Sequence, residues 1–389
     1  MTCGRTAYAC GIVALHGSDL SVNDFAAAIG REALAAEASF ASIFFSHEFC
    51  EAPHLAEALR RNAPGLRYAA CSTAGEVSPD GYAAGHILAV LFSDARFAVK
   101  ATMFDALGSR SMDDMAARVA ELRREAEACD GAGRGSLFAL LLIDGLSRAE
   151  EAVTSALHWG LDDIPLVGGS AGDDLRFEKT TLILDGRTAS DAAILMLVRS
   201  QVPFQVFKTD NFVPTSRKLV VTESNPDARR VVEFNAEPAA QAYAEAIGID
   251  PQTLGPMSFA SHPVVVRVGG EYYCRSIQKV HPDGSLTFFC AIDNGVVLTV
   301  AQPKGMVEST RDKLLAIGDR LGGIDLVLGF DCVLRRLDAE NRQSFRTISQ
   351  LYRDNRVIGF GTYGEQFRSM HLNQTLTGIA FGRAAEAAE

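Results

Sequence analysis

The sequence has 389 residues, of which 48% are hydrophobic and 22% charged; this is a globular profile, long enough for two domains. A formal net charge of −11 and scattered basic residues argue against nucleic acid or an anionic membrane surface as partner. Apolar runs such as residues 137–143 are too short to span a bilayer. The N-terminal apolar patch is short and interrupted by Cys10 and Gly11, so it makes a poor secretory signal and we expect a cytoplasmic protein.

The cysteines are dispersed and form no C-x-x-C pair, so they give no sign of a structural zinc site. In the expected cytoplasmic setting they should be reduced thiols, several of them buried. They are Cys3, Cys10, Cys50, Cys71, Cys129, Cys274, Cys290 and Cys332.

Two helices of the first half are marked by their N-cap residues. Ser21 opens a predicted helix over residues 21–39. Ser111 opens a second over 111–130, which carries acids in its first turn and apolar side chains on one side.

One unit occurs in three copies along the chain. The apolar segments 41–49 and 66–76 reappear 97 residues later without a gap, and a third copy occupies 324–332 and 356–365. Each copy reads as a strand, a helix, a second strand and a small-residue turn ending in Gly-Glu or Gly-Asp. A further apolar strand follows in each copy, over 86–92, 192–198 and 376–381.

Continuous apolar runs joined by a helix are typical of parallel strands that are buried on both faces. The strand that follows each turn predicts an antiparallel neighbour. The expected fold class is therefore α/β, with repeated strand-helix-strand units forming mixed sheets in two domains.

The turns of the first and third copies resemble each other closely. A shift of 289 residues places Thr73, Gly75 and Glu76 on Thr362, Gly364 and Glu365. Glycine permits a tight bend, and Thr and Glu side chains satisfy backbone groups where a strand ends. We interpret the Thr-x-Gly-Glu turn as a scaffold element.

The second half begins after the turn at 223–228 with a predicted helix over 237–249. A β-rich block follows, in which Gly269-Gly270 and Asp283-Gly284 predict hairpins. The predicted domains are residues 25–225 and 226–385.

At several motifs the chain resembles the FIST family, whose members combine a FIST N-terminal and a FIST C-terminal domain. The resemblance covers roughly residues 25–383, and one departure is "NFVPTS" at 211–216, where family members often carry Gly-Trp. The motifs are "CSTAGEV" (71–77), "VGGSAGDDLRF" (167–177), "DAAILMLV" (191–198), "RRVVEFNAEPAAQAY" (229–243), "HPVVVRVGGEYYCRSIQ" (262–278), "GFGTYGEQF" (359–367) and "MHLNQTLTGIAFG" (370–382).

The resemblance implies a cytosolic sensory module of signal transduction that is not an enzyme. One branch is similar to haem-binding nitric-oxide sensors that act on a separate histidine kinase or cyclic-di-GMP enzyme. The first hypothesis for this chain is such a haem-dependent sensor, in which nitric oxide would bind the ferrous haem and weaken the bond between iron and a histidine.

The histidines are the places to look for a haem ligand. His262 precedes Pro263 at the entry to an apolar strand, where an extended backbone could fix the imidazole, so it is the candidate iron ligand. The alternative is an ordinary loop histidine. His371 is the second candidate, with Asn373 and its neighbours available to bond its second nitrogen; the alternative is a polar network that closes the repeat.

Arg275 stands beside Tyr272 and Tyr273 and could pair with a carboxylate, either a haem propionate or an amino-acid ligand. An internal salt bridge to Glu271 or Glu365 is the alternative. The candidate cofactor-binding residues are thus His262, His371 and Arg275.

Two further functions stay open at this point. One is a sensor of an amino-acid-like molecule that binds through Arg275 without haem. The other is a hydrolase with Cys71 as nucleophile, although no residue pattern identifies the base that such a thiol needs.

Overall fold

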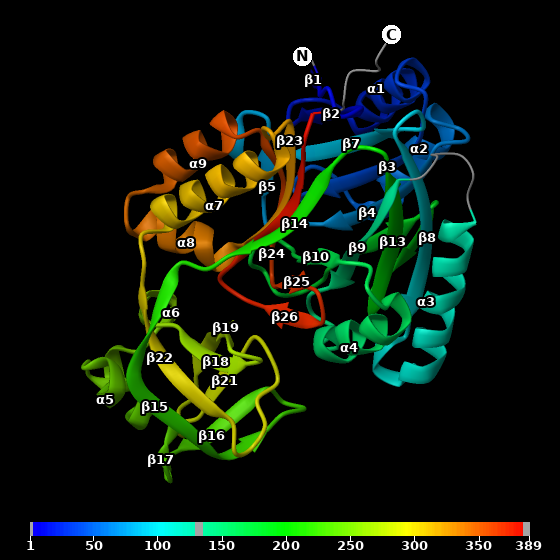
Figure 1. Cartoon of the computed structure of the whole chain (residues 1–389). Helices are drawn as coiled ribbons and strands as arrows, with labels where there is room; N and C mark the ends of the chain where they lie inside the picture. Colours follow the sequence, from blue (N-terminus) through cyan, green and yellow to red (C-terminus); the bar gives the residue numbers. More distant parts are fainter. Residues whose placement is uncertain (1–2, 129–134, 384–389) are drawn as a thin grey trace.

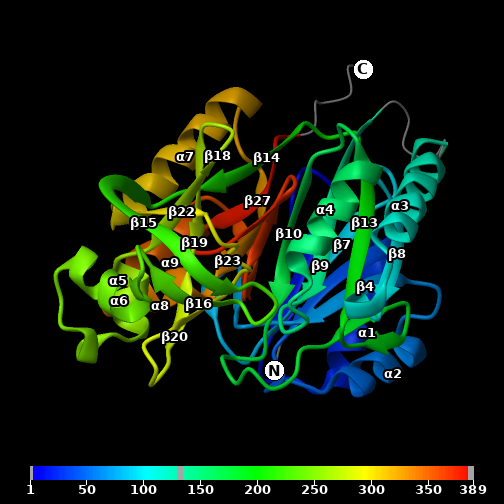
Figure 2. The same ribbon diagram turned by 90° about the horizontal axis from the view of Figure 1, so that it is seen from below.

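The computed structural model describes residues 3–128 and 135–383. The chain folds into a large α/β part, here called the core (residues 3–209 and 304–383). A smaller β-domain (212–303) is inserted between these two stretches of the core. The β-domain, coloured green to yellow, projects from one side of the core in both views (Figures 1 and 2).

Three mixed sheets build the core. The first has the order β1 (Gly4–Ala7), β2 (Ile12–Gly17), β7 (Ile87–Ser93), β3 (Ala38–Phe45), β4 (Arg67–Ser72), β11 (Leu182–Leu184) and β12 (Arg187–Ala189). The second has the order β26 (Met370–Leu372), β25 (Glu365–Phe367), β10 (Leu166–Ala171), β9 (Ser136–Asp144), β13 (Ala192–Ser200) and β8 (Phe97–Asp105). The third has the order β14 (Phe204–Thr209), β27 (Leu376–Phe381), β23 (Leu326–Cys332), β24 (Val357–Thr362), β5 (Glu76–Ser78) and β6 (Gly81–Ala83).

Each sheet carries helices on its outer face, as the apolar clusters between helices and strands show. The helices are α1 (Val22–Ala35) and α2 (Ala52–Asn62) on the first sheet, α3 (Met112–Glu127) and α4 (Glu150–Leu161) on the second, and α7 (Met306–Leu321), α8 (Val333–Asn341) and α9 (Phe345–Asp354) by the third. A short 3₁₀ turn, η1 (Leu107–Ser109), precedes α3.

The caps predicted for two helices are confirmed. The Ser21 hydroxyl accepts the Asp24 N–H at the start of α1, and the Ser111 hydroxyl accepts the Asp114 N–H at the start of α3. Residues 129 and 130, the end of the predicted second helix, lie outside the described residues.

The inner faces of the three sheets meet in one apolar cluster at the centre of the core. Phe360 of the third sheet stacks on Phe44 of the first, with ring centroids 4.7 Å apart, and meets Phe330 edge to face at 5.5 Å. Strands that pack inward on this cluster and outward on helices are buried on both faces, which is why their sequences are continuously apolar.

The predicted parallel pairs and antiparallel neighbours are confirmed. In each unit the first strand pairs in parallel with the second and antiparallel with the last, as β3 does with β4 and β7. The same holds for β9 with β10 and β13, and for β23 with β24 and β27. The α/β fold of repeated units with mixed sheets in a two-domain layout is therefore confirmed.

The hairpin after each unit's second strand joins the sheet of another unit. β5 pairs with β24, β11 with β4, and β25 with β10. The three units thus exchange hairpins in a cycle. The sheet of the first unit is completed by a hairpin of the second, that of the second by the third, and that of the third by the first.

The β-domain is a strongly bent sheet with two short helices and a 3₁₀ turn. Its strands run in the order β19 (Glu271–Arg275), β18 (Val264–Val268), β22 (Val297–Pro303), β15 (Phe212–Asn225), β16 (Arg230–Phe234), β21 (Leu286–Phe288) and β20 (Ile277–Val280), with β17 (Glu237–Pro238) on β16. Its helical segments are α5 (Ala239–Ile247), η3 (Pro251–Thr253) and α6 (Pro256–Ser261). Both predicted hairpins, β18–β19 and β20–β21, are confirmed. The predicted boundary between 225 and 226 falls in the turn from β15 to β16 and stays a prediction.

Candidate ligand-binding site

The three small-residue turns meet where the hairpins exchange. Backbone hydrogen bonds link them in a closed ring: Ala74 N to Gly361 O at 2.8 Å, Tyr363 N to Ser170 O at 3.2 Å and Gly172 N to Ser72 O at 3.1 Å. The ring fixes the position of each hairpin relative to the other two.

The Thr-x-Gly-Glu turns have the scaffold role that their sequence predicts. In the first, the Thr73 hydroxyl bonds the Glu76 carboxyl group, whose other oxygen accepts the His86 N–H at 3.1 Å. In the third, Thr362 bonds Glu365, which also accepts the backbone N–H and hydroxyl of Thr375. Burial raises the pKa of Glu76 and of Glu365 to about 8.

The two hairpins that follow these turns differ on one face. A shift of 289 residues places Val77, Tyr82 and Ala84 of β5–β6 on Gln366, His371 and Asn373 of β25–β26. One hairpin thus carries two apolar side chains and a phenol where the other carries two amides and an imidazole.

The three polar side chains of the third hairpin, here called the polar triad, share one face. Gln366 pairs directly with His371 across the hairpin, and Asn373 follows two residues later. Their exposed fractions are 0%, 3% and 0%. The Gln366 Nε2 donates to the Ser170 Oγ at 2.9 Å and lies 3.4 Å from the His371 Nδ1.

Four buried atoms of the polar triad have no hydrogen-bond partner among the described residues: Gln366 Oε1, His371 Nε2, Asn373 Oδ1 and Asn373 Nδ2. Leaving such an atom unpaired costs about 1–3 kcal/mol, so native proteins seldom do so without a water or ligand. This is the densest group of unpaired buried atoms in the described part of the chain.

The imidazole of His371 is neutral near pH 7. Burial lowers its pKa to about 4, against an opposing effect of Glu151. Since the Gln366 amide N–H points at Nδ1, that nitrogen is the acceptor and the ring proton is on Nε2. The unpaired Nε2 is therefore a donor.

The β-domain covers the polar triad. The Arg275 Nη1 donates to the His371 carbonyl at 3.0 Å, and the Gln374 Nε2 donates to the Phe259 carbonyl at 3.4 Å. Figure 1 places the β25–β26 hairpin, in red, between α4 and the strands of the β-domain.

A cleft of about 410 Å³ lies beside this contact, lined by Glu150, Arg229, Phe289 and Tyr363 among others. Arg229 and Phe289 are also neighbours of His371, and the Phe289 backbone group interacts with the ring without meeting hydrogen-bond geometry at Nε2. Arg229 donates to Glu150 at 2.5 Å and to Glu151 at 2.9 Å, and so ties the β-domain to the start of α4. Burial raises the pKa of Glu150 to about 7, although Arg229 acts in the opposite direction.

Two family patterns match the chain nearly end to end. The FIST N domain matches residues 39–237 and the FIST C domain matches residues 239–368. The chain belongs to the FIST family. FIST domains are sensory domains of signal transduction rather than catalytic domains.

One curated relative is an uncharacterized protein of Methanocaldococcus jannaschii, MJ1623. It is 23% identical to this FIST protein over an alignment of length 254, and the match covers 56% of the present chain and 49% of the relative. The chain thus spans about half the length of this curated relative. No helix of the described residues is long and apolar enough to cross a membrane.

Two of the predicted site residues of this FIST protein, Arg275 and His371, lie together. Arg275 bonds two backbone carbonyls, of Cys274 and of His371. It takes part in no ion pair within the described residues, so the predicted alternative of a salt bridge to Glu271 or Glu365 is wrong. The guanidinium holds the third hairpin against the β-domain.

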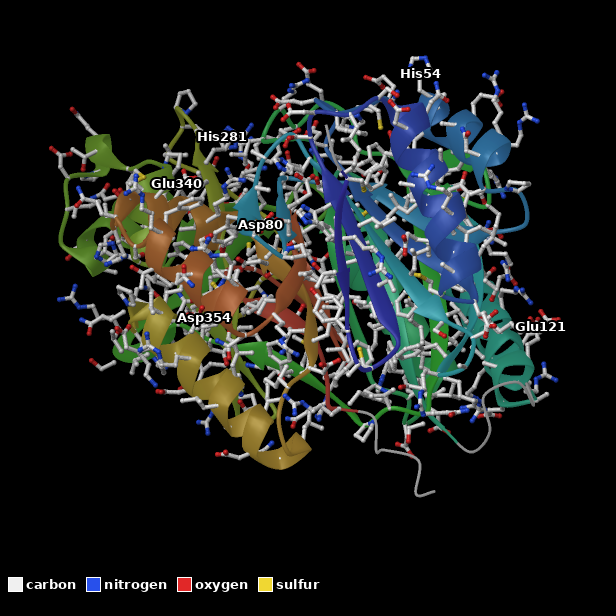
Figure 3. The ribbon with its side chains drawn as sticks, turned by 90° about the horizontal axis from the view of Figure 1, so that it is seen from above. His54, Asp80, Glu121, His281, Glu340 and Asp354 are labelled. Carbon is white, nitrogen blue, oxygen red and sulfur yellow. The ribbon has the colours of Figure 1, made fainter. Side chains whose placement is uncertain are left out.

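His262 forms no hydrogen bond with the polar triad within the described residues. It ends helix α6, where its Nδ1 lies 3.3 Å from the Ser258 carbonyl and its own carbonyl accepts the Tyr243 hydroxyl. The ring therefore faces its own helix. In Figure 3, His54 lies by the helices of the first sheet and His281 on the side of the β-domain.

The surroundings of His262 and His371 do not fit a haem. A haem ligand needs an imidazole nitrogen directed into an apolar slot as wide as a porphyrin. Neither histidine lines any of five cavities in the described part of the chain, and Gln366 and Asn373 line none of them either. A porphyrin therefore has no slot there, and a smaller group reaches the polar triad only if the β-domain shifts. The His371 ring packs so closely on Gly364 that a Cβ there would lie 2.2 Å from its Cε1. Haem binding stays a prediction, which an absorption spectrum of the protein mixed with haemin tests.

Cys71 lies inside β4 with none of its surface exposed, and burial raises the pKa of its thiol well above the usual range. A protonated thiol without access to solvent is a weak nucleophile. The described residues also contain no group of three His, Cys, Asp or Glu side chains placed to hold a metal ion.

Sequence reasoning identified His371 but gave its neighbours other roles. Asn373, Gln374 and Thr375 were expected to bond its second nitrogen, whereas Nε2 has no partner in the described structure. Gln374 instead contacts the β-domain and Thr375 bonds Glu365. The overlooked signal was the change from Val77 to Gln366 and from Ala84 to Asn373 between the two copies.

Proposed function

We propose that this FIST protein senses a small, amino-acid-like molecule that binds where the β25–β26 hairpin meets the β-domain. The observation that carries the proposal is the set of four unpaired buried atoms on the polar triad. A ligand that pairs with these atoms would recover about 1–3 kcal/mol for each of them. The adjoining cleft is lined by Arg229 and Glu150, which form an ion pair with each other and so present charges of both signs beside the polar triad.

Binding at this place gives a route to signal output. The polar triad belongs to the core, whereas Arg275 and Arg229 reach it from the β-domain. A ligand that contacts both parts favours one relative placement of the β-domain over another. We propose that a separate histidine kinase or cyclic-di-GMP enzyme in the cytoplasm reads this placement, which the family resemblance suggests.

A thermal-shift screen of the purified protein with the standard amino acids tests the proposal, followed by calorimetric titration of each compound that raises Tm. We expect saturable one-to-one binding that the Asn373→Leu variant loses. The matched control is Asn62→Leu, which removes an amide at the end of α2, far from the polar triad.

Two results would count against the proposal. One is a panel that leaves Tm unchanged. The other is a bound amino acid whose affinity is the same in Asn373→Leu as in the unsubstituted protein, since the site would then lie elsewhere.

A further inference from the structure

The unpaired atoms of the polar triad have a defined hydrogen-bonding pattern. His371 Nε2–H and Asn373 Nδ2 are donors, and Gln366 Oε1 and Asn373 Oδ1 are acceptors. A partner that satisfies all of them must itself offer both acceptors and donors. A carboxylate offers acceptors alone, and an ammonium group offers donors alone.

The polar triad also carries no formal charge. Gln366 and Asn373 are amides, and His371 is neutral because burial lowers its pKa. An ionised ligand group placed here would be desolvated without a counter-ion, which is strongly unfavourable.

The charged groups nearest the polar triad are already engaged. Arg275 bonds two carbonyls, and Glu151 accepts the Ala291 N–H at 3.0 Å as well as Arg229. Arg229 in turn bonds Glu150 and the Phe289 carbonyl. None of these side chains is left free to neutralise a charged ligand group at the polar triad.

The unpaired atoms are held in place before any ligand arrives. Gln366 is fixed by its bond to Ser170 and by the pairing of β25 with β10. The His371 backbone is fixed by Arg275 and by its pairing with Gln366. Preorganised groups lose little entropy on binding and discriminate strongly between ligands.

The hairpin itself does not require these polar atoms. At the equivalent positions of β5–β6 stand Val77, Ala84 and Tyr82, and the Tyr82 hydroxyl has a partner in Asp331. The same kind of hairpin therefore folds without unpaired polar atoms at these positions, so folding alone does not explain the unpaired atoms of β25–β26.

We infer that the polar triad accepts an uncharged amide-type group of the ligand: a carboxamide, a ureido group or a lactam. Such a group has a carbonyl acceptor and N–H donors side by side, which matches the mixture of donors and acceptors on the polar triad. The inference rests on the proposed function for the existence of the site, and it adds the chemistry of the ligand. A buried water has the same mixed capacity and is the competing occupant.

Pairs of probes test the inference on the full chain. In each pair one member carries an amide where the other carries a carboxylate. The pairs are L-glutamine with L-glutamate and nicotinamide with nicotinate, each titrated by calorimetry at pH 7. We expect the amide member to bind at least about tenfold more tightly, the effect of one unmatched buried hydrogen bond. Asn373→Leu should abolish the difference and Asn62→Leu should preserve it.

The other outcomes separate this inference from the proposed function. Equal or tighter binding of the carboxylate, lost in Asn373→Leu, overturns the amide assignment and leaves a sensor site at the same place. If neither these probes nor any standard amino acid binds, both proposals fail, and a lower unfolding temperature of Asn373→Leu would then show that the asparagine amide already has a partner such as a buried water. Amide binding that survives Asn373→Leu overturns the assignment to the polar triad.

Discussion

The β5–β6 and β25–β26 hairpins are copies of one device with different outer faces. Both begin with a Thr-bonded buried glutamate, at Glu76 and Glu365, and both pair with a strand of another unit. The first packs beside α9, and the third is covered by the β-domain. The comparison teaches that the turn fixes the position of a hairpin, while its outer face adapts to the element that covers it.

The first hairpin shows what a completed polar network looks like in this fold. Tyr82 stacks on Phe345 with ring centroids 5.1 Å apart and donates to Asp331. Asp331 also accepts from Tyr352 at 2.9 Å and from Arg335 at 2.7 Å. Each of these polar groups has a partner, in contrast to the polar triad.

The largest expected effect comes from breaking that completed network. Asp331→Ala leaves the guanidinium of Arg335, which is 0% exposed, without its counter-ion. Removing one partner of a buried pair costs about 3–5 kcal/mol. Urea unfolding should therefore show the free energy of unfolding reduced by about that amount.

Asp354→Ala is the matched control for Asp331→Ala. Asp354, labelled in Figure 3, is an exposed aspartate at the end of α9 that bonds the Gln350 amide. Its loss should change the free energy of unfolding by less than about 0.5 kcal/mol. Equal effects of the two substitutions would contradict the role given to the Asp331 network.

The shared glutamates should make both hairpins titrate alike. Their folded pKa of about 8 lies above the ordinary value of 4.5, so the folded state keeps protons that the unfolded state releases. Stability from Glu76 and Glu365 is complete below about pH 4.5 and is lost as pH rises toward about 8. The slope is about 1.4 kcal/mol per pH unit for each group within that window.

Glu76→Gln and Glu365→Gln should each flatten this part of the pH profile, because a glutamine amide can donate to the threonine hydroxyl at every pH. Urea unfolding at a series of pH values from 5 to 8 measures the slope. A slope that stays unchanged in both variants would show that these carboxyl groups ionise normally in the folded protein.

His371 should distinguish the third hairpin from the first, where Tyr82 does not titrate in the same range. The folded pKa of about 4 lies below the ordinary 6.5, so stability from the neutral ring is complete above about pH 6.5. It is lost as pH falls through about 4. His371→Gln should remove that acid-side loss when unfolding is measured between pH 7 and 4, while Tyr82→Phe should leave it intact.

Much of the core could be predicted from the sequence, because strand pairing inside a unit follows from the 97-residue repeat and from continuous apolar runs. The exchange of hairpins could not. Whether β5 extends its own sheet or pairs with Gly359 and Phe360 is decided by packing around the shared centre, and no local pattern records it.

The site could be predicted only in part, because its main property also depends on tertiary packing. His371 stood out by residue type, but the unpaired state of Gln366 and Asn373 depends on what covers the hairpin, which is a tertiary fact. For His262, an extended backbone before Pro263 was expected to hold the ring in a fixed direction beside an apolar strand, whereas at the end of α6 its Nδ1 lies 3.3 Å from the Ser258 carbonyl.

The smallest expected effect is also the most informative about the two hairpins. Asn373→Leu removes two unpaired buried polar atoms without breaking a hydrogen bond within the described residues. Replacing such groups by an apolar side chain of similar size is nearly neutral or stabilising. In the ligand-free protein the free energy of unfolding should therefore change by less than about 1 kcal/mol, or rise.

The opposite result would be as clear. A loss of about 2 kcal/mol or more in Asn373→Leu would mean that the asparagine amide has partners in the folded protein, as Tyr82 has in the first hairpin. The two hairpins would then be equally complete. The outer face of β25–β26 would serve to seal the core against the β-domain, and the sensing site would have to be sought in the cleft beside Arg229.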